Sequence, residues 1–227
     1  MSRLQWDETG KRLYETGVTR GVLYPYGDSG YEAGVAWNGL VSVTESPTGA
    51  EATPLYADDI KYLELFSTEE FGATIEAYTY PDEFAECDGS IAVTPGVTIG
   101  QQDRKSFGLC YRTTVGNDVK NNNFGYKLHL IYGCKASPSE KGYSTINDSP
   151  EAITFSWEVT TTPVAVTDNK PTSTLVIDST KLKPATMTAV EDLLYGGTAA
   201  AKLPLPDEII QLIKTKESAL SMSEKSK

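Results

Sequence analysis

Residues 152–162 read AITFSWEVTTT, and apolar and polar side chains alternate along this stretch. One side carries the apolar set, which is Ile153, Phe155, Trp157 and Val159, and the other carries Thr154, Ser156, Glu158 and Thr160. A period of two is typical of a β-strand with one face in a core and the other facing water or a partner. Trp157 is therefore predicted to be a core residue.

The segment 124–135, FGYKLHLIYGCK, repeats the alternation. Its predicted core side is formed by Phe124, Tyr126, Leu128, Leu130 and Tyr132. Lys127, His129, Ile131 and Lys135 form the opposite, polar side, which gives His129 a surface or cross-strand role. Gly, Pro, Asn and Asp separate further strand candidates at residues 17–24, 35–44, 60–67, 73–80, 90–98, 106–115 and 172–178. This pattern predicts a mainly β fold.

Helical patterns are few. Residues 81–89 begin with proline and acids and end at Gly89, which predicts a short helix of about two turns. Residues 186–195 and 206–216 have apolar stripes with helical spacing. The polar residues 218–227 are predicted to form a flexible tail. With 227 residues in total, the chain is interpreted as a single domain, residues 1–217, followed by that tail.

The charge of the chain is concentrated in one region. Asp and Glu number 31 against 20 Lys and Arg, for a formal net charge of −11. Residues 45–88 contain twelve acids and one base, Lys61, so this stretch accounts for the whole excess. Such acidity argues against a protein that grips DNA through a basic surface. The acidic region is either a solvated face or a field directed at a partner.

Few residues could support catalysis. The chain has one histidine and three widely spaced cysteines, Cys87, Cys110 and Cys134, which match neither a disulfide framework nor a zinc site and are predicted to be buried thiols. Nucleophile-elbow, P-loop, dinucleotide-binding, EF-hand and HExxH patterns are lacking in the sequence. We therefore expect no enzymatic activity, no catalytic residue, no metal site and no cofactor. No apolar run has the length of a membrane span, and the N-terminus does not resemble a signal peptide, so the expected folding compartment is a cytoplasm.

Residues 45–59, ESPTGAEATPLYADD, lack sustained periodicity and are predicted to form a long loop. Leu55 and Tyr56 indicate that this loop either docks onto a partner or folds back over its own sheet. The strand predicted next, residues 60–67, is largely apolar on both faces. Such a strand is expected between two layers or at a subunit boundary.

The order of these elements resembles one protein family. The run at 57–89, ADDIKYLELFSTEEFGATIEAYTYPDEFAECDG, with TGVTRGVLYP at 16–25 and FGYKLHLIYGCKASPSEKGYSTINDSPEAITFSWEVTTTPVAV at 124–166, resembles the major tail tube proteins of long-tailed, non-contractile bacteriophages of Gram-positive hosts. The likeness extends over most of the chain. It depends on the order of elements, because the family has no catalytic motif.

The resemblance implies an antiparallel β-sandwich or barrel-like tail-tube fold with a short flanking helix and C-terminal helices. Six copies would close into a ring, and rings would stack into a hollow virion tail that is assembled in the host cytoplasm. The implied partners are copies of the chain, the tape-measure protein, the tail terminator, the distal tail protein and double-stranded DNA that passes without specific binding; no membrane is implied.

The resemblance also suggests roles for two sets of residues. The long loop would reach the neighbouring ring through Pro47, Gly49, Pro54, Leu55, Tyr56, Asp58 and Asp59. A conduit for DNA should carry few lysines and arginines, because each phosphate that they neutralise adds salt-dependent retention. Some of four acids are therefore hypothesised to face the lumen: Glu64, Glu69, Glu70 and Glu76.

Alternative functions remain open at this point. Thirteen tyrosines and three tryptophans would suit a carbohydrate- or receptor-binding β-sandwich, since exposed aromatic rings stack on sugars; Trp6 and Trp37 have no predicted place. The tube subunit of a phage-tail-like bacteriocin or secretion device would share the tube architecture. A hydrolase with paired carboxylates is disfavoured, because adjacent acids such as Asp58 and Asp59 point to opposite faces of a strand.

Overall fold

The computed structural model describes residues 3–146, 148 and 151–225. The described chain is mainly antiparallel β-structure with three α-helices, and it is consistent with the sandwich-like fold class that was predicted. Its elements are β1 (Leu13–Gly27), β2 (Gly30–Tyr31), β3 (Val35–Trp37), β4 (Leu40–Glu45), β5 (Ala52–Ala57), β6 (Ile60–Phe66), β7 (Gly72–Ala77), α1 (Phe84–Cys87), β8 (Ile91–Thr94), β9 (Val97–Ile99), β10 (Phe107–Asn117), β11 (Asn121–Ala136), β12 (Phe155–Thr161), β13 (Thr174–Asp178), the 3₁₀ turn η1 (Ser179–Lys181), α2 (Pro184–Tyr195) and α3 (Pro206–Lys225).

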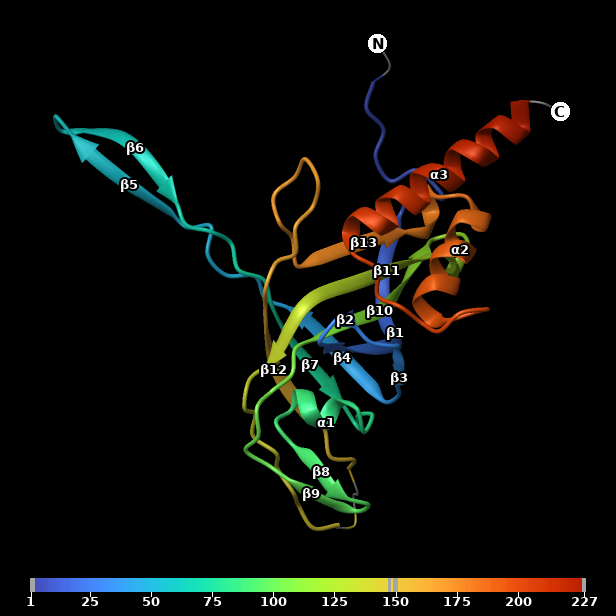
Figure 1. Cartoon of the computed structure of the whole chain (residues 1–227). Coiled ribbons are helices and arrows are strands. Elements are labelled where there is room, and N and C mark those ends of the chain that lie inside the picture. Colours follow the sequence, from blue (N-terminus) through green and yellow to red (C-terminus); the bar gives the residue numbers. More distant parts are fainter. Residues whose placement is uncertain (1–2, 147, 149–150, 226–227) are drawn as a thin grey trace.

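One nine-stranded sheet forms the body (Figure 1). Its strand order is β2-β1-β10-β11-β12-β7-β4, with β3 paired to β1 and β13 paired to β11. β3 and β4 follow each other directly in the chain, yet β3 pairs with β1 near one end of this order and β4 pairs with β7 near the other. The sheet therefore curls round until its two ends meet, and its interior becomes a core.

Two glycines turn the corners of this curled sheet. Gly39 separates β3 from β4 and has φ +74°. Gly133 has φ +61° and lies where β11 changes its partner from β13 to β12. A Cβ atom on Gly133 would lie 2.2 Å from the carbonyl oxygen of Thr162. Strands that pass between layers commonly bend at such points, and glycine adopts these angles more readily than any other residue.

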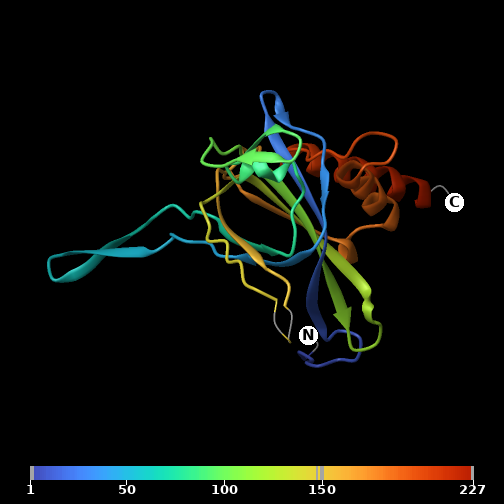
Figure 2. The same cartoon turned by 90° about the horizontal axis from the view of Figure 1, so that it is seen from below.

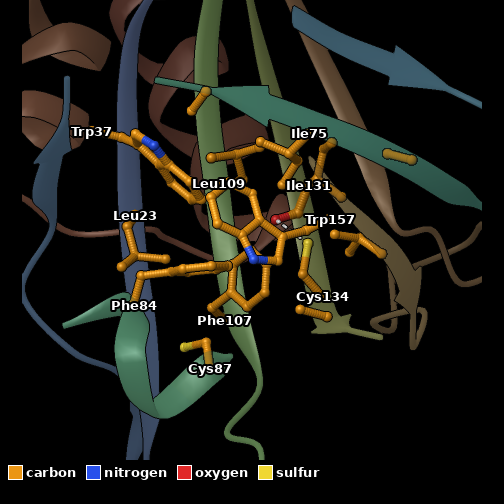
Figure 3. Close-up of a cluster of buried hydrophobic side chains, with 14 of the residues drawn as sticks. Leu23, Trp37, Ile75, Phe84, Cys87, Phe107, Leu109, Ile131, Cys134 and Trp157 are labelled. Carbon is orange, nitrogen blue, oxygen red and sulfur yellow. Dashed lines mark hydrogen bonds between the residues drawn. The ribbon is translucent and has the colours of Figure 1, made fainter. Parts of the chain in front are cut away.

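The core inside the sheet is built on aromatic rings (Figure 3). Trp157 is fully buried, as predicted, and its ring lies 5.0 Å from Phe84 and 5.4 Å from Tyr80, both edge-on. Trp37 is also buried and donates a hydrogen bond from Nε1 to the carbonyl oxygen of Thr79 at 3.0 Å. Edge-to-face pairs of this kind each add about 0.5–1.5 kcal/mol beyond the burial of apolar area. The short predicted helix forms only over the four residues of α1, about one turn where about two were expected, and Phe84 and Cys87 insert into this core.

A second core lies between β11 and the two long helices. Leu128, Leu130 and Tyr132 pack there with residues of α2 and α3 such as Val190 and Ile209. The predicted core side of this strand is thus confirmed for these three residues. The expectation of a polar opposite side is wrong at Ile131, which is buried in the first core. β11 is apolar on both faces there because helices cover one face and the curled sheet covers the other.

Helix α3 extends well beyond its predicted end at residue 216. The structure continues it to Lys225, so residues 218–225 of the expected tail are helical; residues 226–227 lie outside the described part. One contact that favours the extension is made by Glu217, whose carboxylate accepts hydrogen bonds from the backbone N–H of Lys183 and the hydroxyl of Thr186. These bonds lower the pKa of Glu217 and cap the N-terminus of α2, where Lys183 has no capping side chain of its own.

Two predicted strands are each divided. Residues 35–44 form β3 and β4, and residues 90–98 form most of the hairpin β8–β9. In that hairpin Ile91 pairs with Ile99, and Val93 and Val97 lie on the same side by alternation. All four aliphatic side chains are exposed. The hairpin lies at the end of the body opposite α3 (Figure 1).

Candidate functional site

A long hairpin projects from the body (Figures 1 and 2). It consists of β5 and β6 and is named the arm here, residues 52–66. Asp58 and Asp59 form its tip, both with positive φ (50° and 57°), as a tight two-residue hairpin turn requires. The predicted loop at 45–59 is therefore wrong for residues 52–57. Pro54 and the lack of alternation argued against a strand, but β5 has only one neighbouring strand in the described structure, and an edge strand tolerates proline.

The arm is apolar on both faces. Leu55 pairs directly with Leu63, and Leu65 lies on the same side, which we call the leucine face. The other side carries Pro54, Tyr56 and Phe66, and Glu64 is its charged member, directly opposite Pro54. Seven large apolar side chains of the arm are exposed by 38% to 70%, namely Leu55, Tyr56, Ile60, Tyr62, Leu63, Leu65 and Phe66. The sequence predicted a strand of this kind either between two layers or at a subunit boundary. The body covers neither face, so the first alternative is wrong and the second stays a prediction.

The root of the arm holds two of the predicted loop residues. Pro47 and Gly49 lie in the outgoing segment, which is bridged to the returning segment where Thr48 pairs with Glu70. Gly49 has φ +84°, and a Cβ atom there would lie 2.3 Å from the carbonyl oxygen of Thr68. Only glycine therefore fits where the two segments leave the body.

The four acids proposed for a lumen lie in three places. Glu64 is on the arm and forms an ion pair with Lys61. Glu69 and Glu70 lie at the arm root, and both are exposed. Glu76 lies in β7 and accepts a hydrogen bond from Ser42 Oγ at 2.7 Å. The structure does not bring these four side chains together, so their lumen position stays a hypothesis.

The neighbours of Glu76 form a surface that the sequence analysis missed. The register of β4, β7 and β12 places small hydroxyl and acidic side chains in rows on the side away from the core. We name this surface the polar face; its residues are Ser42, Thr44, Thr74, Glu76, Ser156, Glu158 and Thr160. Its three strands carry no lysine or arginine there, and Lys135 of β11 borders it beside Thr160. The alternation in residues 152–162 predicted that Glu158 faces away from the core. It did not predict which strands would lie beside it.

A polar network fixes the strand from which the arm departs. Glu45 ends β4, and its Oε1 accepts a hydrogen bond of 2.7 Å from the Tyr111 hydroxyl of β10. His129 of β11 stacks on the Tyr111 ring, with centroids 4.7 Å apart. His129 Nδ1 lies 3.7 Å from Glu45 Oε1, and His129 Nε2 lies 3.3 Å from Glu15 Oε1 of β1. His129 thus has the cross-strand position that was predicted, while its acidic partners were not foreseen.

The electrostatics of this network favour charged carboxylates. The nearby His129 ring, together with the hydrogen bond from Tyr111, lowers the pKa of Glu45 against the opposing effect of burial. Burial acts to raise the pKa of Glu15, but hydrogen bonds from Lys127 and Thr113 outweigh it and lower that pKa. Both carboxylates therefore hold their charge to lower pH than an isolated glutamate.

The cysteines are buried free thiols, as predicted, and burial raises the pKa of both Cys87 and Cys110 to about 12. Within the described residues, no group of three or more His, Cys, Asp or Glu side chains could hold a metal ion. None of the described helices is long and apolar enough to cross a membrane.

No family model matches the chain, and no curated protein sequence matches it significantly. The class of protein is therefore defined by the fold and its surfaces: a barrel-like β-domain with the projecting arm and the polar face.

The Glu45 network predicts an acid-dependent contribution to stability. A lowered folded-state pKa stabilises the fold above the unfolded pKa, about 4.5, and this stabilisation is lost as the pH falls through the folded value. Glu45→Gln should lower the free energy of unfolding at pH 7 by less than about 1 kcal/mol, because the Glu45 side chain is 41% exposed. Urea denaturation at pH 7 and pH 3 measures this. An equal loss at both pH values would contradict the account.

Proposed function

We propose that the chain is a structural subunit whose copies form rings that stack into a hollow tube, the tail tube of a long-tailed, non-contractile bacteriophage. The observation that carries this proposal is the arm, which has apolar side chains on both faces and lies away from its own body. A self-assembling protein needs such a surface, whereas a monomer does not.

The arm is unsuited to a protein that works as a monomer. An isolated two-stranded hairpin is at best marginally stable in water. Its exposed leucines and aromatic rings would also promote non-specific association, since exposed apolar strands aggregate unless they are covered. Docking on another molecule removes both problems. Copies of the chain are the partner proposed here, because a projecting element that contacts a different surface of the next copy generates rings and open stacks.

The polar face supports the second half of the proposal, a conduit for double-stranded DNA. Glu76 and Glu158 lie among serines and threonines there, without lysine or arginine on the three strands. Such a wall repels phosphates weakly and offers no cation that would hold them. We propose that the polar face lines the lumen and that Glu76 is the member of the sequence-based set that lies there.

The structure bears differently on the two alternative functions. Sugar binding through tryptophan is weakened, because Trp37 and Trp157 are core residues and Trp6 is the exposed tryptophan. A tube subunit of a phage-tail-like bacteriocin or secretion device shares every assembly feature proposed here. It differs in the cargo of the lumen.

Removing the arm should abolish tube formation and leave the fold intact. Residues 52–66 are replaced by a two-residue Gly-Ser turn; Glu51 and Ser67, already hydrogen-bonded to each other, would flank the new turn. We expect an unchanged melting temperature, because the arm contributes nothing to either core. Negative-stain microscopy of concentrated protein should show tubes for the full chain and none for the variant. Abundant tubes from the variant would contradict the proposal.

Lysines on the polar face should turn the conduit into a DNA-binding surface. Tubes of Glu76→Lys/Glu158→Lys should retain double-stranded DNA at low salt and release it at high salt, in a co-sedimentation assay. The matched control is Asp28→Lys/Asp192→Lys, which makes the same charge change in the β1–β2 turn and on α2. Equal retention by both variants would show that the polar face does not meet the DNA.

A further inference from the structure

A shallow apolar groove runs between β13 and α3. Its volume is about 280 Å³, and its walls include Leu175, Val176, Leu182, Ile210 and Ile213. Ile210 and Ile213 come from α3, which runs above β13 (Figure 1). The groove is thus a strip of apolar surface with a helix on one side and a strand on the other.

The strand that borders the groove has one edge without a neighbouring strand. β13 pairs with β11 along one edge, and its other edge pairs with no strand in the described part of the chain. On that edge Thr172 Oγ1 bonds to the backbone N–H and C=O of Thr174. Alternation then directs the peptide groups of Val176 to the same open edge, and the Val176 side chain is 50% exposed. β13 carries no central charge or proline of the kind that usually protects an edge strand.

The arm has the properties that this edge and groove require. Its two strands each have a free outer edge, so either can add to a sheet through main-chain hydrogen bonds. A strand that is apolar on both faces suits a position inside a sheet that is covered on both sides. Beside β13, one face of the arm would lie beneath α3, against Ile210 and Ile213.

Charge sets the direction in which the arm would lie. Asp58 and Asp59 give its tip two negative charges, while Lys181 lines the groove just beyond the end of β13. Asp178 also lines this end of the groove, and its carboxylate accepts hydrogen bonds from the backbone N–H and the hydroxyl of Thr180. Lys214 lies one helical turn beyond Ile210 on the same side of α3. Neither lysine makes an ion pair with a described residue. With its tip at Lys181, β6 runs antiparallel to β13, as every other pair in the sheet does.

We propose that the free edge of β13 and the groove beneath α3 receive the arm of a second copy of this chain. β6 of one copy pairs with β13 of the next, the leucine face meets Ile210 and Ile213, and the acidic tip lies beside Lys181 and Lys214. This inference rests on the proposed function, and it names the surface on which the assembly contact is made.

Disulfide trapping tests the contact directly, because the three native cysteines are buried. Leu63→Cys/Ile210→Cys is assembled under reducing conditions, oxidised, and run on a non-reducing denaturing gel. We expect a ladder of covalent oligomers, since each copy carries both halves of the contact. The control is Leu63→Cys/Val93→Cys, whose second cysteine replaces an exposed valine of β8–β9. It should give dimers at most.

The outcomes separate this inference from the proposed function. Assemblies that form but give no ladder with the 63/210 pair would overturn the docking site and leave self-assembly standing. A ladder with the 63/93 pair would also overturn it and assign the contact to β8–β9. Failure of the unmodified chain to assemble at any concentration would overturn both proposals.

A charge exchange provides a second test that introduces no cysteine. Lys181→Glu/Lys214→Glu should raise the concentration needed for assembly at least about tenfold, and adding Asp58→Lys/Asp59→Lys to the same chain should restore it. Lys135→Glu/Lys216→Glu is the matched control; Lys216 lies on the same helix, two residues beyond Lys214 and therefore on another side. Loss of assembly without rescue, or an equal loss in the control, would contradict the proposed contact.

Discussion

The closure of the sheet around Trp157 is the constraint on which the rest of the molecule depends. The indole is fully buried among edge-on aromatic rings, and it can be so only because the strands turn corners at Gly39 and Gly133 and wrap around it. The same closure gives β11 two buried faces, one towards the aromatic core and one towards α2 and α3. A body that is complete in this way has no need of the arm for its own stability, which leaves the arm available for another molecule.

The arm and the polar face have separate proposed roles: the arm joins copies of the chain, and the polar face lines the lumen. The arm leaves the body from the end of β4, where Glu45 is held by Tyr111 and His129, so its root is tied to strands on the far side of the curled sheet. β4 also contributes Ser42 and Thr44 to the polar face. One strand therefore links the element proposed to join copies with the surface proposed to face DNA, and the arrangement of copies would set the position of that wall.

Much of the fold follows from periodicity, while most of the candidate site does not. The alternation of apolar and polar residues located nearly every strand and the core position of Trp157, because a strand with one buried face has an apolar residue at every second position. It failed at Ile131, since a strand covered on both sides loses that signal, and it failed for β5, where Pro54 masked an exposed edge strand. The acids of the arm could be found by counting charge. The polar face could not, because it exists only once β4, β7 and β12 lie side by side in a register that no local pattern specifies.

Hydrogen–deuterium exchange of the arm amides, measured on dilute and on concentrated protein, tests the central claim most directly. The claim is that residues 52–66 are stabilised by a second copy of the chain. In the dilute monomer these amides should exchange within seconds, because an isolated hairpin opens readily, while β11 and β12 stay protected. In the concentrated assembly the arm amides should become as slow as those of the body. Protection of the arm in the monomer, or rapid exchange of the arm within assembled tubes, would contradict the account.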